Sequence, residues 1–151
     1  MERRHKKYYS RVRAIFADTD AMQVVYHVNY IKWFEIGRNE MLRQSGYPYT
    51  EMVDDGIWMP VVEVGCEYKS PAIYDDLIEI SAWIEYVKGA VVMIGYECKN
   101  EETGKLYVKG FTKACGPAPW CRRRGKSRAS RGSAASCGRW AGPRESPWWA
   151  G

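Results

Sequence analysis

The chain has 151 residues, a length that suits one domain with a single core and no need for disulfides or metals. No apolar run reaches the roughly 20 residues of a membrane span, and no apolar segment follows the basic start, so we expect a cytoplasmic protein. The five cysteines lack paired spacings, which indicates reduced thiols, and we expect no metal or other cofactor.

The net charge of +5 comes from one end of the chain. Residues 1–114 hold 15 Lys and Arg against 17 Asp and Glu, whereas residues 115–151 hold eight basic residues against one acid. Residues 115–151 also contain no Val, Ile, Leu, Met, Phe or Tyr, so they cannot build a packed core. We therefore predict a folded domain over residues 1–114 and a disordered, basic, low-complexity tail over 115–151.

The composition of the tail suggests an origin. Most of its residues are those that GC-rich codons specify, and it holds four of the seven tryptophans without any periodicity. Our hypothesis is that the reading frame shifts near Ala114 and that the tail is a non-native translation. The alternative is a genuine basic arm.

Two elements are predicted in the first third of the chain. Apolar side chains recur at every second position from Tyr8 to Phe16, which indicates a strand. From Asn29 to Ser45 the period changes to that of an amphipathic helix of four to five turns. Its apolar stripe holds Tyr30, Trp33, Phe34, Ile36, Gly37 and Met41. Gly46 is suited to follow the helix, and Tyr47-Pro48 ends it.

Three or four further strands follow. They are predicted over Ile57 to Tyr68, Asp76 to Tyr86, Ala90 to Cys98 and Lys105 to Ala114, and turn residues at Lys88-Gly89 and from Asn100 to Gly104 separate the last three. Strands that follow one another through short turns form antiparallel sheets. With one apolar helix after the first strand, the pattern predicts an α+β domain in which the sheet wraps around the helix.

The connection between the first strand and the helix holds the candidate chemistry. Asp18, Asp20 and His27 lie on it, just before the helix begins. A helix N-terminus presents N–H groups without intrahelical partners and the positive end of the helix dipole. If the helix begins near His27, the N–H groups of His27 and Val28 are candidates to hold an oxyanion. Asp20 could then attack an acyl carbonyl as nucleophile or general base.

Each of these residues taken alone has a structural alternative. Asp18 is expected to be a turn or capping acid, because such residues are common in loops of this kind. A lone Asp20 or His27 is more often structural than catalytic. Tyr26, Tyr30 and Trp33 taken alone would belong to the core rather than to a pocket wall.

Taken together, the residues resemble the hotdog-fold acyl-CoA thioesterases, in particular the 4-hydroxybenzoyl-CoA thioesterase-like group that includes the Tol-Pal-associated enzymes. The resemblance covers roughly residues 8–113. The matching segments are Asp18-Thr19-Asp20, Val24-Val25-Tyr26-His27, Asn29-Tyr30, Trp33-Phe34-Glu35 with Arg38 and Glu40, Val62 to Tyr68, Pro71, Asp75-Asp76 and Gly110 to Lys113.

The resemblance implies a hotdog fold, with a five-stranded antiparallel sheet around one long central helix. It implies homodimers or homotetramers with active sites at subunit interfaces, and hydrolysis of acyl-CoA to a free acid and CoA without a metal. By position, Asp20 would be the catalytic carboxylate and His27 would assist it. The N–H of His27 or Val28 would polarise the thioester, and Tyr26 and Val28 would contact the substrate. The acyl group and the choice between CoA and an acyl carrier protein stay open.

Two positions depart from the family pattern. Gln23 stands where the family often has glycine, so a positive φ there would strain the loop or change its shape. The tail also replaces the end of the last strand and the closing segment, which would affect the stability of the sheet edge.

Three other functions compete with hydrolysis. A hotdog acyl-CoA sensor without turnover would need no carboxylate facing the thioester, and Asp20 and His27 argue against it. A hotdog enoyl-CoA hydratase also uses an Asp and a His, but with a shorter interval than the seven residues here. A nucleic-acid-binding protein rests on the tail charge alone, and we expect no nucleic acid partner.

Overall fold

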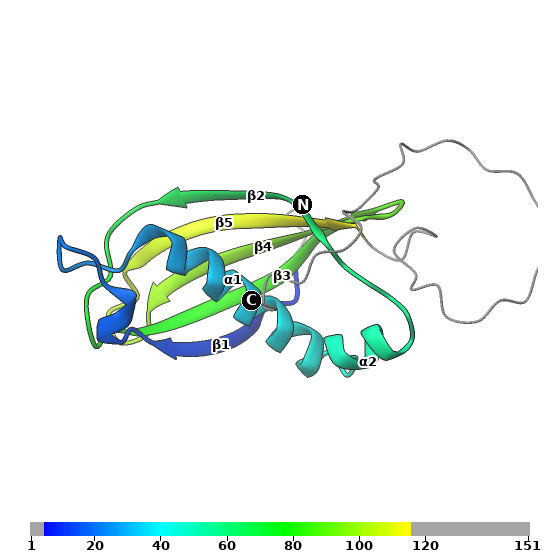
Figure 1. The fold of residues 1–151 in the computed structure, drawn as a ribbon, viewed down its shortest axis with the longest axis horizontal. Coiled ribbons are helices and arrows are strands. Elements are labelled where there is room, and N and C mark those ends of the chain that lie inside the picture. The colour runs from blue at the N-terminus through cyan, green and yellow to red at the C-terminus, as the bar shows by residue number, and fades with distance from the viewer. Residues whose placement is uncertain (1–4, 116–151) are drawn as a thin grey trace, which may run out of the picture.

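The computed structural model describes residues 5–115 (Figure 1). Its elements in chain order are β1 (Tyr8–Arg13), the 3₁₀ helix η1 (Phe16–Asp18), α1 (His27–Gln44), α2 (Tyr49–Asp54), β2 (Val61–Tyr68), β3 (Leu77–Lys88), β4 (Val91–Asn100) and β5 (Leu106–Cys115). The predicted tail and the frameshift hypothesis concern residues that lie outside this range. Of the predicted tail, only Cys115 falls within it, as the last residue of β5.

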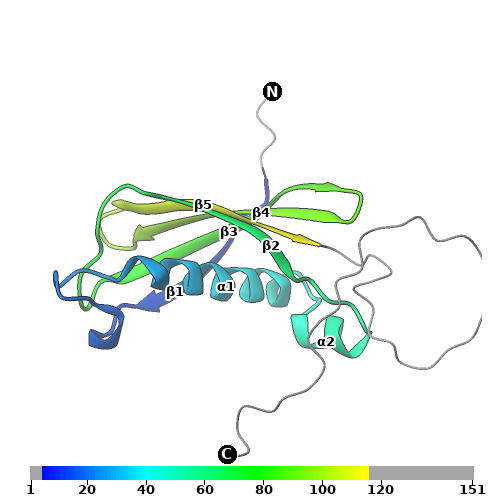
Figure 2. The ribbon, with the colours of Figure 1, turned by 45° about the horizontal axis from the view of Figure 1, so that its top comes forward.

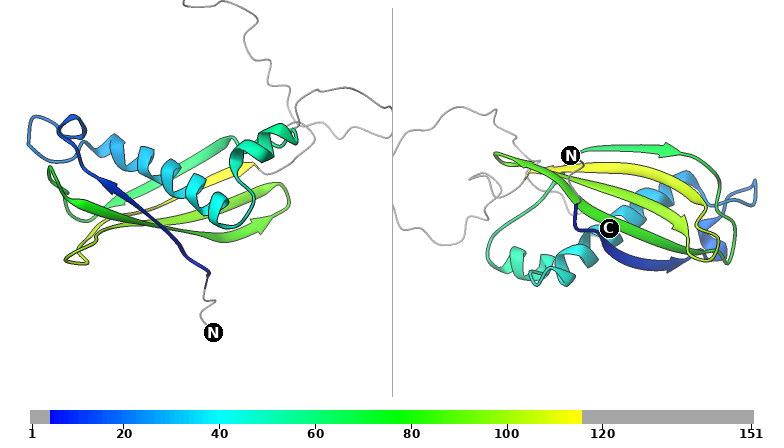
Figure 3. Two further views of the ribbon diagram at one scale, coloured as in Figure 1. Left: turned by 90° about the horizontal axis from the view of Figure 1, so that it is seen from below. Right: turned by 180° about the vertical axis from the view of Figure 1, so that it is seen from behind.

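All five strands form one antiparallel sheet in the order β1-β3-β4-β5-β2. The predicted turns are confirmed: Lys88 pairs with Val91 across a two-residue loop in which Gly89 has φ +59°, and β4 and β5 join through residues 101–105. The long helix α1 lies along one face of the sheet, with β2 at one edge and β1 at the other (Figures 2 and 3). The α+β class and the five-stranded sheet around one long helix are therefore confirmed.

The core forms where α1 meets the middle of the sheet. The Phe34 ring stacks on that of Tyr96 with centroids 4.6 Å apart, and both side chains are fully buried. Glycines make this approach close, because a Cβ on Gly37 would lie 2.8 Å from Ile80 and one on Gly110 would lie 2.6 Å from the Phe34 ring. Burying an aromatic side chain of this size contributes about 1.5–3 kcal/mol.

The helix prediction holds with one exception. The apolar stripe is buried at Tyr30, Trp33, Phe34, Gly37 and Met41. Ile36 was expected to widen it, but this side chain is 42% exposed. It is two residues from Phe34, about 200° around the helix, and therefore points away from the sheet.

The C-terminal end of α1 is closed by a Schellman motif, as Gly46 predicted. Gly46 has φ +89°, and its N–H donates to the Arg43 carbonyl at 3.1 Å while the Tyr47 N–H donates to Leu42 at 3.2 Å. The Ser45 hydroxyl also donates to Leu42. The chain then enters α2 directly after Pro48, a short helix that the sequence had not indicated.

Two strand predictions were too long. β1 ends at Arg13, and Phe16 is 80% exposed at the start of η1 instead of facing the core. The chain turns there because the Asp18 carboxylate accepts a hydrogen bond from the Ile15 N–H at 3.0 Å. The strand expected from Ile57 begins only at Val61, since α2 and the segment after it occupy residues 49–60.

Candidate functional site

The connection from η1 to α1 folds as a small hairpin. Thr19 pairs with Val25, and the Asp20 N–H donates to the Val24 carbonyl at 2.9 Å. The hairpin is fixed to the chain after β2, because the Val25 N–H donates to Ala72 at 2.8 Å. This connection is thus held by regular backbone hydrogen bonds on a rigid scaffold, as functional loops commonly are.

Asp18 fastens the start of α1 to this hairpin. Its carbonyl accepts hydrogen bonds from the Tyr26 N–H and from the buried Asn29 amide Nδ2, both at 2.8 Å. Its carboxylate is occupied by the Ile15 N–H. The expectation that Asp18 is a capping acid is confirmed.

Asp20 lies at the tip of the hairpin, and one of its two carboxylate oxygens accepts a hydrogen bond. Oδ1 accepts a hydrogen bond from the Met22 N–H at 2.8 Å, as in an Asx turn. Among residues 5–115, none donates a hydrogen bond to Oδ2. Asp20 therefore shares with Asp18 the turn-forming role predicted for Asp18 alone, while one of its oxygens stays available.

The turn that begins at Asp20 requires a positive φ at position 23, which a residue with a side chain, such as Gln23, adopts less readily than glycine. The Gln23 N–H donates to the Asp20 carbonyl at 2.9 Å, and Gln23 has φ +63°. A side chain in this left-handed region costs roughly 1–2 kcal/mol relative to glycine. The loop therefore keeps a positive φ at this position and bears the strain.

The N-terminal end of α1 has no side-chain cap. The cap residue is Tyr26, whose side chain accepts no hydrogen bond from the helix, and the first turn contains no acid. The Asn29 N–H donates to the Tyr26 carbonyl. No acceptor within residues 5–115 binds the N–H groups of His27 and Val28. Tyr26 and Val28 are 45% and 40% exposed, so a ligand can approach this end of the helix.

The His27 ring stands between two tyrosines on the surface. It makes edge contacts with Tyr26, with centroids 4.5 Å apart, and with Tyr68 at 6.2 Å. No hydrogen bond or ion pair within the described chain joins it to Asp20. The hairpin explains the separation, since Asp20 lies at its tip and His27 lies beyond its base.

Tyr68 is a residue of this site that the sequence analysis did not single out. Its hydroxyl donates to the His27 carbonyl at 2.9 Å, and its ring also contacts Tyr30. Burial raises the pKa of Tyr68 to about 12, so the hydroxyl stays protonated and can donate at neutral pH. Its position at the end of β2 brings the sheet edge to the start of α1.

The other aromatic residues near the site divide between core and surface. Tyr30 and Trp33 are buried, as expected, and the Tyr30 hydroxyl accepts a hydrogen bond from the Ala72 N–H at 3.0 Å. Tyr26 was expected in the core when taken alone, and its exposure shows that this was wrong. The ring is therefore accessible from solvent, and its contact with a substrate stays a prediction.

The described residues hold no group of three or more His, Cys, Asp or Glu placed to bind a metal ion. None of the helices found between residues 5 and 115 is both long and apolar enough to cross a bilayer.

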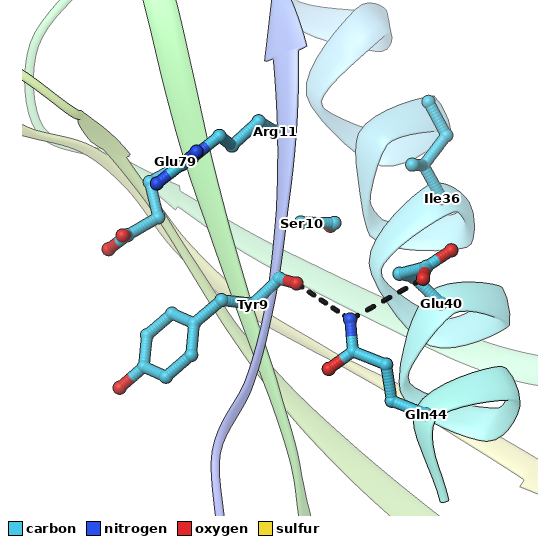
Figure 4. A pocket seen from close by; sticks show the side chains of 7 residues that line it. All are labelled: Tyr9, Ser10, Arg11, Ile36, Glu40, Gln44 and Glu79. Carbon is cyan, nitrogen blue, oxygen red and sulfur yellow. Dashed lines mark hydrogen bonds between the residues drawn. The ribbon is translucent and has the colours of Figure 1, made fainter. Parts of the chain in front are cut away.

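A separate groove of about 450 Å³ lies between β1 and the second half of α1 (Figure 4). Its lining residues are Tyr9, Ser10, Arg11, Ile36, Glu40, Gln44 and Glu79. The Gln44 amide crosses it and donates to the Tyr9 carbonyl at 2.9 Å. None of the predicted site residues lines this groove.

Comparison with known proteins places the chain among thioesterases. The family model described as "Thioesterase superfamily" matches residues 22–107, a range that contains His27 and Val28 and begins two residues after Asp20. The acyl-CoA thioester hydrolase YbgC of Escherichia coli O157:H7 is 33% identical over 95 residues, which cover 63% of this chain and 71% of the relative.

Two solved structures have the same fold and comparable identity. A hypothetical protein of Aquifex aeolicus is 35% identical with a TM-score of 0.67, covering 72% of this chain and 86% of the other. A DHNA-CoA thioesterase of Staphylococcus aureus is 31% identical with a TM-score of 0.69, covering 73% of each chain.

Proposed function

We propose, since the chain belongs to the thioesterase superfamily, that it hydrolyses acyl-CoA thioesters to a free carboxylic acid and CoA. Relatives at 31% and 33% identity carry the names of CoA thioester hydrolases, which supports this substrate class. The single observation that carries the proposal is the start of α1, where an exposed helix end without a side-chain cap follows a hairpin with a half-buried carboxylate at its tip.

The unbonded N–H groups of His27 and Val28 are the proposed electrophile. They point out of the helix end and carry the positive end of its dipole. A thioester carbonyl oxygen bound there would be polarised. The oxyanion that forms on attack would be stabilised more strongly than the carbonyl, which is the condition for lowering the barrier.

Asp20 is the proposed carboxylate, acting through its free oxygen Oδ2 either as nucleophile or as general base. As a base, it takes a proton from water while the water oxygen bonds to the carbonyl carbon. The tetrahedral intermediate then breaks the C–S bond and expels CoA as a thiolate, which receives the proton held by Asp20. As a nucleophile, Asp20 bonds to the carbonyl carbon, the C–S bond breaks, and CoA leaves as a thiolate while a mixed anhydride remains. Water then hydrolyses the anhydride to the free acid and the Asp20 carboxylate, and the proton released goes to the thiolate.

His27 and its aromatic neighbours are proposed to position the substrate. The imidazole lies on the helix end itself and is accessible. The exposed Tyr26 ring and the Val28 side chain flank the same N–H groups and offer apolar contact to the acyl group or the pantetheine arm. Tyr68 keeps this end of α1 in place through its hydrogen bond to the His27 carbonyl.

The active form is proposed to be a homodimer or homotetramer with sites at subunit interfaces. The outer edge of β2 pairs with no other described strand, and Val61, Val62 and Val64 are each more than 40% exposed along it. An apolar sheet edge of this kind is usually covered. Because Tyr68 connects the end of β2 to His27, a second copy on this edge would lie next to the proposed site. Light scattering on the purified chain measures the assembly.

The domain division is also a proposal. Residues 1–114 would form the thioesterase domain, and residues 115–151 would be a non-native translation of the locus. The nucleotide sequence of the source locus tests this, and an intact single frame through residue 151 would refute it.

A panel of acyl-CoA substrates tests the function. Short aliphatic, long aliphatic and aromatic acyl-CoAs are incubated with the chain, and the release of free thiol is measured. We expect thiol release from at least one member. A binder without turnover would change its fluorescence on titration but release no thiol. A hydratase would consume the double bond of crotonyl-CoA while the thioester stayed intact.

A further inference from the structure

The segment between β2 and β3, residues 69–76, holds the hairpin of the proposed site in place. The Val25 N–H donates to the Ala72 carbonyl at 2.8 Å, and Val24 pairs with Ile73 in an antiparallel bridge. The segment itself belongs to no helix or named strand. The contacts that fix this segment therefore also fix the backbone of the hairpin.

Tyr107 of β5 contacts both ends of the segment. Its carbonyl accepts hydrogen bonds from the Lys69 and Ser70 N–H groups at 2.8 and 3.2 Å. Its hydroxyl donates to Asp76 Oδ2 at 2.7 Å, and the same oxygen accepts the Ile73 N–H at 3.0 Å. The contact of Tyr107 with the first end uses the backbone, whereas its contact with the second end depends on the hydroxyl.

Asn100 fixes the direction of the bond from Tyr107 to Asp76. The Asn100 Oδ1 atom accepts the N–H groups of Glu102 and Thr103, both at 2.9 Å. The Asn100 amide Nδ2 therefore faces the Tyr107 hydroxyl and donates to it at 2.8 Å, which leaves the hydroxyl proton for Asp76. Burial and the hydrogen bond to Asp76 raise the pKa of Tyr107 to about 12, so this proton stays in place at neutral pH.

We propose that Tyr107 and Asp76 are positioning residues: their hydrogen bond holds residues 69–76 against the hairpin and so sets where the Asp20 carboxylate lies relative to the N-terminal end of α1. Tyr107 is only 2% exposed, so it acts through the segment and not on a substrate. The role of the pair in catalysis rests on the proposed function, whereas its hold on the hairpin does not. A misplacement of about 1 Å caused by a distant substitution can cost about 100-fold in rate.

Tyr107→Phe tests this role, with Tyr96→Phe as the matched control. Both variants remove the hydroxyl of a buried tyrosine, and the Tyr96 hydroxyl bonds to Thr112 between β4 and β5 instead of to the segment. We expect both to lower Tm by about 5 °C, the effect of one lost hydrogen bond. Only Tyr107→Phe should lower kcat on the best acyl-CoA, by about 10-fold with KM within about twofold, because a displaced carboxylate affects the chemical step.

Amide hydrogen exchange measures the hold on the hairpin without any substrate. The Val25 N–H, which donates to Ala72, should exchange about fivefold faster in Tyr107→Phe than in Tyr96→Phe, the factor that corresponds to one lost hydrogen bond. Asp76→Ala should match Tyr107→Phe in exchange and in kcat. Asp76→Asn should restore most of both, because its amide oxygen can occupy the place of Oδ2 and accept both hydrogen bonds.

Three outcomes would overturn the positioning role. They are equal kcat values in Tyr107→Phe and Tyr96→Phe, equal exchange of the Val25 N–H in the two variants, and faster exchange in Tyr107→Phe without a fall in kcat. If Tyr107→Phe does not fold, the comparison of Asp76→Ala with Asp76→Asn decides by the same two measurements. A wild type that releases no thiol from any acyl-CoA would refute the proposed function instead, and the exchange rates would still decide whether the pair holds the hairpin.

Discussion

The two ends of α1 are built in opposite ways. At the C-terminal end, three consecutive N–H groups from Ser45 to Tyr47 donate to the last turn, and the Ser45 hydroxyl adds a fourth bond. At the N-terminal end, the cap residue is Tyr26, which supplies no side-chain acceptor, and the N–H groups of His27 and Val28 stay unbonded in the described chain.

The difference shows where the helix serves the fold and where it serves the proposed reaction. A side-chain cap stabilises a helix by typically about 1 kcal/mol, and the N-terminal end of α1 forgoes it. The closed end carries no candidate for chemistry. The open end lies beside His27 and follows the hairpin that presents Asp20, so changes at the two ends should separate activity from stability.

The largest expected effect is at Asp20. Asp20→Asn keeps the volume and the acceptor for the Met22 N–H but removes the charge, so kcat should fall by at least about 100-fold. The matched control is Asp18→Asn, which lies two residues away and should keep most of the activity because its carboxylate only caps η1. Thiol release from the best acyl-CoA measures both. Equal losses in the two variants would contradict the role of Asp20.

A smaller effect is expected when the N-terminal end of α1 is given a side-chain cap. Tyr26→Ser introduces an acceptor that can bind the N–H of Val28 or Asn29, whereas Tyr26→Ala removes the same ring without supplying one. Relative to the Ala variant, we expect the Ser variant to be about 1 kcal/mol more stable and its kcat to be about 10-fold lower. Urea denaturation and steady-state kinetics give the two values. If capping left kcat unchanged, the amides would not be the electrophile.

Removal of the Tyr68 hydroxyl should lower activity modestly. Tyr68→Phe keeps both ring contacts and removes only the hydrogen bond to the His27 carbonyl. We expect kcat to fall roughly fivefold with KM nearly constant, since the loss of one neutral hydrogen bond amounts to about 1 kcal/mol. A change confined to KM would instead make Tyr68 a substrate-contacting residue.

A substitution at the C-terminal end of α1, where the Schellman motif lies, should change stability but not activity. Gly46→Ala places a side chain at φ +89° with no atom within 4 Å of its Cβ, so only backbone strain acts against it. The free energy of unfolding should fall by about 1 kcal/mol while kcat stays at the wild-type value. A fall in kcat as large as that of Tyr68→Phe would show that the two ends are coupled.

Much of this arrangement could be predicted from the sequence, because local rules govern it. The period of the apolar residues located α1, Gly46 marked its end, and turn residues marked both of the last hairpins. The capping role of Asp18 could be predicted because aspartate side chains in loops often accept hydrogen bonds from nearby backbone N–H groups.

The parts that could not be predicted depend on contacts between distant residues. Tyr68 meets His27 across 41 positions of the sequence, and no local pattern carries that information. Phe16 looked like the next inward residue of a strand until the Asp18 cap turned the chain. Arg38 entered the sequence analysis only as one residue of the family resemblance, and its burial without a counter-charge appears only once α1 packs on the sheet.

The most direct test of the open helix end is the carbonyl stretch of a bound substrate. Asp20→Asn should bind a ¹³C-carbonyl-labelled acyl-CoA without hydrolysing it, so its infrared difference spectrum can be recorded. If the N–H groups of His27 and Val28 polarise the thioester, the stretch will move to lower wavenumber than in water, and Tyr26→Ser in the same background will reduce the shift. A bound thioester whose stretch matches its value in water would contradict the account.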